Sequence, residues 1–286
     1  MDLLSVSYLV LIIFGTSVQN VLKKLYLNKE KGGGVFVFSA FTVLTALCFF
    51  TVKSLFDFNF SLEVLPYAIG FATGYAFATV FNFLAIGCGP LSLTSLMLSY
   101  SLLIPTAWGV LFDGDEVGIF FYIGILLLAV SLVLVNAKRG ECKITLKWAL
   151  FALLALVGNG ACSTFQAVQS KTFGGKYDGT FMVISLLMVV CVLFVLTFIH
   201  EKDKVKISLK SGIILMVGTG LANGLVNLLV MVCSATVNKS IMFPLISAGS
   251  IVLTWLISRF FYRERLTAKQ NVGMLLGVAS IVFLNL

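Results

Sequence analysis

Apolar and polar positions alternate along this chain in long blocks. Each apolar block is about 20 residues long, which is the length that a helix needs to cross the hydrocarbon core of a bilayer. Short polar connections such as Gly87-Cys88-Gly89-Pro90 and Asn238-Lys239-Ser240 separate the blocks. The pattern predicts an all-α membrane protein with ten transmembrane helices, at 3–22, 34–55, 64–86, 91–112, 118–136, 148–170, 180–200, 212–236, 241–262 and 267–286.

Composition supports a chain that resides in lipid. Of the 286 residues, 59% are hydrophobic and 11% are charged, whereas soluble domains carry about 25% charged residues. The first apolar block has no basic segment before it and no cleavage site after it, which predicts a retained helix. The six cysteines lie scattered without paired ligand spacing, and we interpret them as small hydrophobes. No metal or other cofactor is therefore predicted.

Basic residues alternate between the two sides of the predicted topology. Connections after the first, third, fifth, seventh and ninth helices hold sixteen of the twenty lysines and arginines. Positive residues favour the cytoplasmic side, so the bias predicts a multi-pass protein of the cytoplasmic membrane with both termini outside. Topology thus explains the net charge of +8 without a nucleic-acid partner; the lipid bilayer is the expected partner.

Similar segments recur in the two halves of the chain. Thr16-Ser17-Val18-Gln19-Asn20-Val21 matches the segment from Ser163 to Val168, and Asn82-Phe83-Leu84 matches Asn227-Leu228-Leu229. The run from Gly124 to Asn136 likewise matches that from Gly273 to Asn285. The pattern indicates a duplication into repeats 1–136 and 148–286, joined by a basic linker at 137–147.

Five helices per repeat place the second copy in the membrane upside down relative to the first. Such inverted repeats are common in secondary transporters, where the substrate site lies near the midplane between the halves and access alternates between the two sides. The duplication directs attention to the first, third, sixth and eighth helices.

The architecture resembles that of EamA-type transporters of the drug/metabolite transporter superfamily. The clearest segment runs from Arg263 to Gly273 and is similar to the family pattern E-x-L-T-x-x-Q-x-x-G. Phe14-Gly15 stands where the family often has Trp-Gly, and the charge bias opposes the cytoplasmic termini usual in the family. The resemblance implies this fold and a transport activity, and names no substrate.

Neutral polar residues at membrane depth are the candidate substrate-binding groups, because polar groups inside a bilayer are costly and need partners. None of the twelve acidic residues falls in mid-span, which disfavours the proton-coupled cation exchange of small multidrug resistance relatives. Amides donate and accept hydrogen bonds and suit an uncharged or zwitterionic solute. The candidates are Gln19, Asn20, Tyr75, Asn82, Tyr100, Gln166, Asn223 and Asn227. The alternative is that they only join neighbouring helices.

Other features have a structural and a functional interpretation. Lys24 and Lys171 close their helices as interface anchors or recognise a carboxylate or phosphate. Three Gly-x-x-x-Gly segments, beginning at Gly70, Gly220 and Gly273, allow close helix packing. Pro105 and Pro244 lie inside predicted helices and favour bends there.

The function predicted from the sequence is secondary transport of a small polar metabolite, such as an amino-acid-like solute, by a protein that is not an enzyme. An intramembrane lipid-handling enzyme and a channel or scaffold are the alternatives. No GxxxxGK[ST], HExxH or GxSxG motif is present, so neither ATP hydrolysis nor common hydrolase chemistry is indicated. Substrate, direction of flux, coupling ion and oligomeric state are left open.

Overall fold

The computed structural model describes residues 3–29, 33–54, 59, 61–108, 111–112, 118–135, 145–236, 239–263 and 266–283, and no strand occurs among them. Helices occupy each of the ten predicted ranges: α1 (Leu3–Lys29), α2 (Val35–Ser54), α3 (Leu65–Cys88), α4 (Leu91–Ser99) followed by α5 (Leu103–Trp108), α6 (Ile119–Val135), α7 (Leu146–Phe173), α8 (Asp178–His200), α9 (Val205–Thr236), α10 (Lys239–Phe261) and α11 (Ala268–Phe283). The all-α fold class is confirmed.

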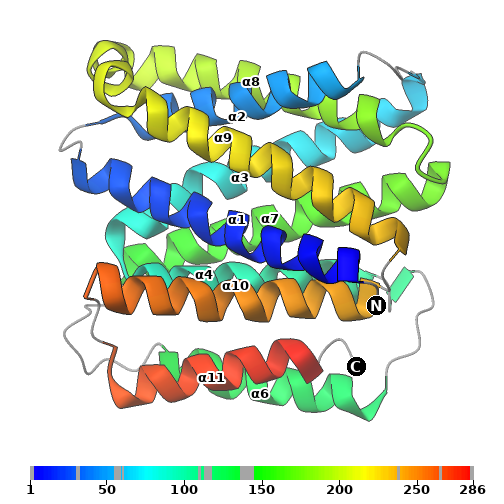
Figure 1. Ribbon diagram of the computed structural model, residues 1–286, viewed down its shortest axis with the longest axis vertical. Helices are drawn as coiled ribbons and strands as arrows, with labels where there is room; N and C mark the ends of the chain where they lie inside the picture. Colours follow the sequence, from blue (N-terminus) through cyan, green and yellow to red (C-terminus); the bar gives the residue numbers. More distant parts are fainter. Residues whose placement is uncertain are drawn as a thin grey trace.

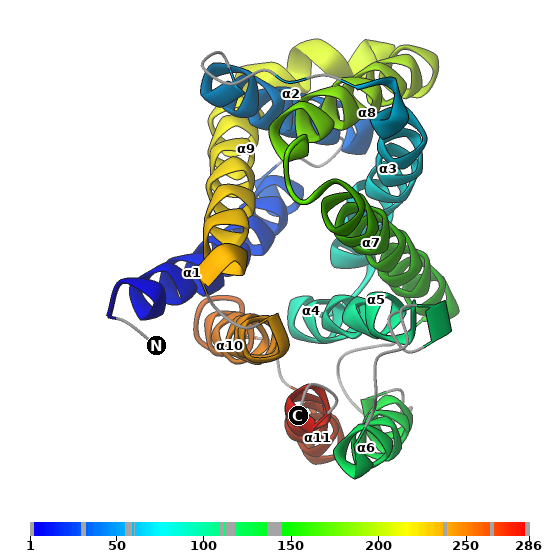
Figure 2. The same ribbon diagram turned by 90° about the vertical axis from the view of Figure 1, so that its right-hand side faces the viewer.

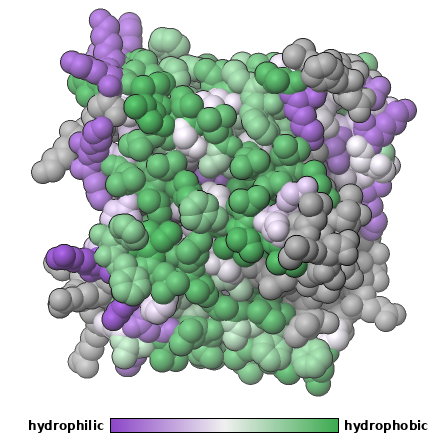
Figure 3. Space-filling model, in the orientation of Figure 1, coloured by the Kyte–Doolittle hydropathy of each residue, from purple (hydrophilic) through white to green (hydrophobic). Residues whose placement is uncertain are grey.

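Six helices in the described ranges are long and apolar enough to cross a membrane, namely α1, α2, α3, α7, α8 and α9. Shorter apolar stretches occur in α4–α5, α10 and α11. The helices lie side by side across the long axis of the molecule (Figure 1), with α6 and α11 as a pair at one edge (Figure 2). Apolar side chains cover the middle of this face and hydrophilic ones gather at the helix ends (Figure 3). These are the features of a multi-pass membrane protein.

Several helices extend beyond their apolar blocks. The helix α1 continues to Lys29 and α9 begins at Val205, whereas the hydropathy pattern placed these boundaries at residues 22 and 212. Lysine is a good helix former, so the helical hydrogen bonds continue where the apolar block stops. Lys23 and Lys24 are therefore helical residues and do not belong to a loop.

Charged side chains at the helix ends bind exposed backbone groups. The Glu201 carboxylate, at the junction of α8 and α9, accepts hydrogen bonds from the backbone N–H groups of Val35, Phe36 and Val37 at 2.8, 2.8 and 3.0 Å. These N–H groups open α2 and have no partner within the helix. Lys24 Nζ donates to the carbonyls of Ile86 and Gly89, at the end of α3, at 3.2 and 3.5 Å. Both contacts complement the helix dipole.

The segment that resembles the family pattern starts a helix. Thr267 N–H donates to Gln270 Oε1 at 3.0 Å, and Gln270 N–H donates to Thr267 Oγ1 at 3.3 Å. This reciprocal pair is a capping box at the start of α11. Thr and Gln at this spacing therefore have a structural role here.

Pro105 marks an interruption of the fourth predicted helix. The 3-10 segment η2 (Tyr100–Leu102) separates α4 from α5. In a regular helix Pro105 would face the carbonyl of Ser101, four residues earlier. Pro105 has no N–H to bond that carbonyl, and its ring would crowd it. The fourth predicted helix is thus interrupted by a 3-10 segment shortly before Pro105. Pro244, by contrast, lies within α10, which is a continuous α-helix from Lys239 to Phe261.

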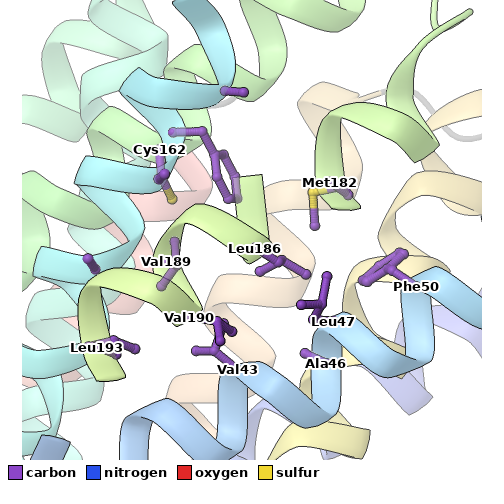
Figure 4. Packing of buried hydrophobic residues seen from close by; sticks show 14 of the residues in the cluster. Val43, Ala46, Leu47, Phe50, Cys162, Met182, Leu186, Val189, Val190 and Leu193 are labelled. Atoms are coloured by element: carbon purple, nitrogen blue, oxygen red, sulfur yellow. The ribbon is translucent and has the colours of Figure 1, made fainter. Parts of the chain in front are cut away.

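The largest apolar cluster joins α2, α3 and α8. Figure 4 shows Val43, Leu47 and Phe50 of α2 facing Leu186 and Val189 of α8, among other buried residues. On its other face, α3 crosses α7 where two glycines meet. A Cβ on Gly74 would lie 2.8 Å from the Gly158 carbonyl oxygen, and a Cβ on Gly158 would lie 2.7 Å from the Ala78 nitrogen. The two backbones are therefore in direct contact.

Candidate functional site

A polar cavity of about 260 Å³ lies between helices of both halves of the chain. It is lined by side chains from α1, α3, α4, η2, α7, α9 and α10. The lining residues are mostly amides and hydroxyls, and include Gln19, Asn20, Tyr75, Asn82, Asn159 and Asn223. Small-molecule sites of this kind are concave and carry a few convergent polar groups.

A hydrogen-bond network connects three of the helices at the cavity. Asn223 Nδ2, on α9, donates to Gln19 Oε1, on α1, at 3.1 Å. Tyr75 of α3 donates its hydroxyl to Asn223 Oδ1 at 2.9 Å. One helical turn away, Asn227 Nδ2 donates to the Asn223 carbonyl at 2.9 Å and to Asn223 Oδ1 at 3.2 Å. Asn223 is thus the central residue, held in one orientation by partners on two other helices.

Two further amides on the lining bind hydroxyls of the fourth predicted helix. Asn20 Nδ2 donates to Ser95 Oγ at 3.2 Å, and Asn159 Nδ2, on α7, donates to Ser101 Oγ at 2.6 Å. Ser101 lies in η2, where the helix is interrupted. The 3-10 turn therefore places its hydroxyl on the cavity.

Some buried polar atoms on the lining have no hydrogen-bond partner. Asn82 is 8% exposed and Ser250 is 7% exposed, yet Asn82 Oδ1 and Ser250 Oγ are both unpartnered. A buried polar atom without a partner costs free energy. Both residues line the cavity, but these two oxygens themselves have almost no accessible surface.

The structure brings five of the eight predicted site residues together at this cavity: Gln19, Asn20, Tyr75, Asn82 and Asn223. Asn227 supports the cavity through Asn223. Gln166, the sequence counterpart of Gln19, is half-buried on α7 and is not on the lining.

Tyr100 also lies away from the lining. Its hydroxyl is 2.7 Å from Ser131 Oγ of α6, and Ser131 donates to the Gly273 carbonyl of α11 at 2.6 Å. Tyr100 thus joins three helices by hydrogen bonds, which is the structural alternative considered for these polar residues.

The α4 and α10 residues of the lining were missed by the sequence reasoning. Repeat matching directed attention to the first, third, sixth and eighth predicted helices, whereas the cavity also has Ser95, Ser99, Ser247 and Ser250 on α4 and α10. Small hydroxyl residues are common in membrane helices as packing residues, so they gave no distinct signal. Lys23 was assigned to a loop because it follows an apolar block, although it lines the cavity.

Among the described residues, no group of three or more His, Cys, Asp or Glu side chains is arranged to hold a metal ion. The described residues of the cavity lining include no acidic residue, no histidine and no cysteine. The polar groups that the lining offers are amides, hydroxyls and the Lys23 ammonium.

Comparisons with known proteins support the fold and assign no function. No family model matches the sequence, and no curated protein matches it. Among solved structures, one described as "Crystal structure of protein" is 16% identical, with a TM-score of 0.62, and the match covers 96% of this chain and 97% of that one. The chain therefore shares its overall fold, along nearly its whole length, with a solved protein.

Proposed function

We propose that this protein is a secondary transporter that moves a small polar metabolite across the cytoplasmic membrane by alternating access through the cavity between α1, α3, α9 and α10. The observation that carries the proposal is the cavity itself. It is lined by amides and hydroxyls inside a bundle whose helices are otherwise apolar. Polar groups held at depth in such a bundle favour a solute pathway over simple packing.

The cavity volume is the first support for a metabolite as the solute. At about 30 Å³ per water molecule, the 260 Å³ space holds the equivalent of about nine waters. A solute of metabolite size fits this space, whereas a lipid with two acyl chains does not. The size therefore favours a metabolite transporter over a lipid-handling enzyme.

Helix contacts support ten spans arranged as two inverted repeats. The contact of α1 with α9 has its counterpart in that of α7 with α3, because each joins the first helix of one half to the third of the other. The contact of α2 with α9 corresponds to that of α8 with α3. Equivalent helices also meet in the pairs α2–α8, α4–α10 and α6–α11. Such reciprocal pairing is expected for two copies related by a two-fold axis in the membrane plane.

The positions of the chain ends support an even number of spans. The start of α1 and the end of α11 lie at the same end of the bundle (Figure 1). Lys29, the α8–α9 junction with Lys202 and Lys204, and Arg259 belong to the opposite helix ends. By the positive-inside rule that opposite end is cytoplasmic and both termini are external, as the sequence predicts. Together with this topology, we propose that the protein belongs to the EamA-type transporters.

A channel is the second candidate on the same scaffold. The hydrogen bonds that Asn223 makes to Gln19 and Tyr75 cross the cavity region from α9 to α1 and α3. A network of this kind, which joins three helices across the cavity, favours a binding site that opens alternately over a permanently open pore. A channel, in contrast, is expected to give unitary currents in a planar bilayer.

Counterflow in proteoliposomes tests the proposal. Vesicles loaded with an unlabelled candidate solute are expected to accumulate the labelled solute transiently and saturably, and protein-free vesicles are not. A panel of amino acids, organic acids, sugars and phosphate esters covers small polar metabolites. If no member of the panel shows saturable exchange while the protein is folded and inserted, the transporter proposal is wrong.

A further inference from the structure

Lys23 and Lys24 are adjacent on α1 and have different surroundings. Lys24 Nζ donates to the backbone carbonyls at the end of α3. Lys23 is half-buried and lies on the lining of the polar cavity. The cavity therefore contains one cationic side chain among its neutral amides and hydroxyls.

Among the residues that the structure describes, no aspartate or glutamate lines the cavity with Lys23. A cation partly removed from water without a counter-ion is costly, and within a membrane protein such a group marks a functional site by default. An anionic group on a solute would supply the counter-ion.

The Asn82 side chain offers a second donor on the same lining. Its Nδ2 group can donate to an anion, whereas its Oδ1 is an acceptor, is buried and makes no hydrogen bond. Lys24 bonds to the Ile86 carbonyl, which lies one helical turn beyond Asn82 on α3. Lys23 and Asn82 are therefore at the same end of the cavity. A solute with an acidic group near Lys23 has both the Lys23 ammonium and the Asn82 Nδ2 group as donors at this end of the site.

We propose that the cavity binds a small solute of net negative charge, with its carboxylate or phosphate group held by Lys23 Nζ and Asn82 Nδ2. This proposal rests on the transport function proposed above and narrows its substrate class. A zwitterion is disfavoured, because the described residues of the lining include no carboxylate to bind its ammonium group. The remaining amides of the lining bind the neutral polar part of the solute.

Thermal stability of the purified protein in the presence of probe solutes tests the assignment. A ligand that binds only the folded state raises its apparent stability. The probes are succinate, inorganic phosphate, the neutral succinamide and the zwitterion γ-aminobutyrate, each titrated at constant ionic strength. Succinate or phosphate is expected to raise the melting temperature of the wild type, and the neutral and zwitterionic probes much less. The larger of the two anion responses identifies the carboxylate or the phosphate as the preferred group.

Variants locate the charge requirement. Lys23→Met is expected to weaken anion binding about ten- to a hundredfold, since hydrogen bonds to charged groups contribute about 1.5–3 kcal/mol and each 1.4 kcal/mol is tenfold. Lys206→Met removes an exposed lysine from α9 and is expected to leave anion binding unchanged. Asn82→Ala is expected to weaken anion binding by a few-fold.

The outcomes separate this proposal from the transport function. If Lys23→Met binds succinate and phosphate as the wild type does, the assignment of Lys23 is wrong. If succinamide or γ-aminobutyrate binds the wild type as well as both anions do, or if neither anion binds, the anionic class is wrong, and this result needs no variant to fold. In these cases saturable counterflow of a neutral or zwitterionic solute in the same vesicles still supports a transporter, whereas absence of any counterflow contradicts the transport function itself.

Discussion

The α3–α7 crossing and the α1–α9 crossing each join one half of the chain to the other, and they differ in what lies between the helices. At α3–α7, Gly74 and Gly158 let the two backbones touch. At α1–α9, Gly15 faces the side chain of Val226, and the Gln19 to Asn223 hydrogen bond connects the helices beside the cavity. The first crossing is thus a backbone contact and the second a side-chain contact. Residues beside both crossings line the cavity, Tyr75 and Asn159 at the first and Gln19 and Asn223 at the second.

This difference determines how each crossing responds to a larger residue. Backbone contact leaves no side chain free to adjust, so a side chain added at Gly74 or Gly158 must separate α3 from α7. At α1–α9 the contact is made by side chains, which can change rotamer. Overpacking is therefore expected to lower stability more at the first crossing than at the second, whereas changes to the polar lining residues beside either crossing are expected to alter solute binding.

The largest effect is expected for Gly158→Ala. The added Cβ meets backbone atoms at 2.7 and 2.8 Å, so α3 and α7 must separate, and overpacking of this kind costs about 1–3 kcal/mol. A clear fall in melting temperature in detergent is expected. Gly15→Ala is the matched change at the other crossing. There the new Cβ crowds only a side chain, that of Val226 at 2.6 Å, and lies at ordinary contact distance, 4.0 Å, from the Ala222 carbonyl oxygen, so a smaller fall is expected. Gly218→Ala, with its nearest atom at 3.5 Å, is the control. Equal losses for Gly158→Ala and Gly15→Ala would contradict the comparison.

Glu201→Ala tests a polar contact that stabilises the packing of α2 against the junction of α8 and α9. It leaves the three N–H groups that open α2 without their carboxylate, and loss of such a cap costs about 0.5–2 kcal/mol. The expected result is a lower melting temperature with solute binding retained in the protein that remains folded. Asp203→Ala removes an exposed acid two residues away and should leave stability unchanged. Unchanged stability of Glu201→Ala would show that water replaces the cap.

Gln19→Ala and Gln166→Ala distinguish two residues that occupy equivalent places in the sequence repeat. Gln19 lies on the cavity and accepts a hydrogen bond from Asn223, whereas Gln166 lies outside the lining. Gln19→Ala is expected to slow solute exchange about fivefold, corresponding to about 1 kcal/mol, with little change in expression. Gln166→Ala is expected to exchange solute like the wild type. Equal effects of the two changes on exchange would mean that the repeat, and not the cavity, determines their role.

The smallest effect is expected for Tyr100→Phe. It removes one hydroxyl from the Tyr100–Ser131–Gly273 connection between η2, α6 and α11. Side-chain hydrogen bonds in membrane proteins contribute about 0.6 kcal/mol on average, so a fall in melting temperature of a degree or two is expected, with normal exchange. A selective loss of exchange at unchanged stability would instead assign Tyr100 to the solute pathway.

Helix positions could be predicted from the sequence because membrane helices satisfy their backbone hydrogen bonds internally. An apolar block of sufficient length is therefore enough to locate each helix, and helices are present in all ten ranges. Helix ends were less predictable. Lys23 lies six residues before the end of α1 because helical hydrogen bonding does not stop where hydropathy falls.

Chemistry alone was enough to select five of the eight candidate residues that line the cavity. Neutral amides and a tyrosine at membrane depth are costly, so they stand out in the sequence. The serines of α4 and α10 could not, because a small hydroxyl residue in a membrane helix is equally compatible with packing. Tyr100 and Gln166 share the chemistry of the site residues, but the rotation of their helices directs them elsewhere.

The sequence by itself determined the all-α class, the places of the helices and the chemistry available at depth, because each of these depends on local composition. Only the tertiary structure decided which helices touch, which of the matching glutamines meets the cavity, and that Lys23 faces the cavity while Lys24 binds the end of α3. The physical reason is that a helix presents side chains in all directions, about 100° apart per residue. Which of them become buried together depends on contacts between segments far apart in the chain.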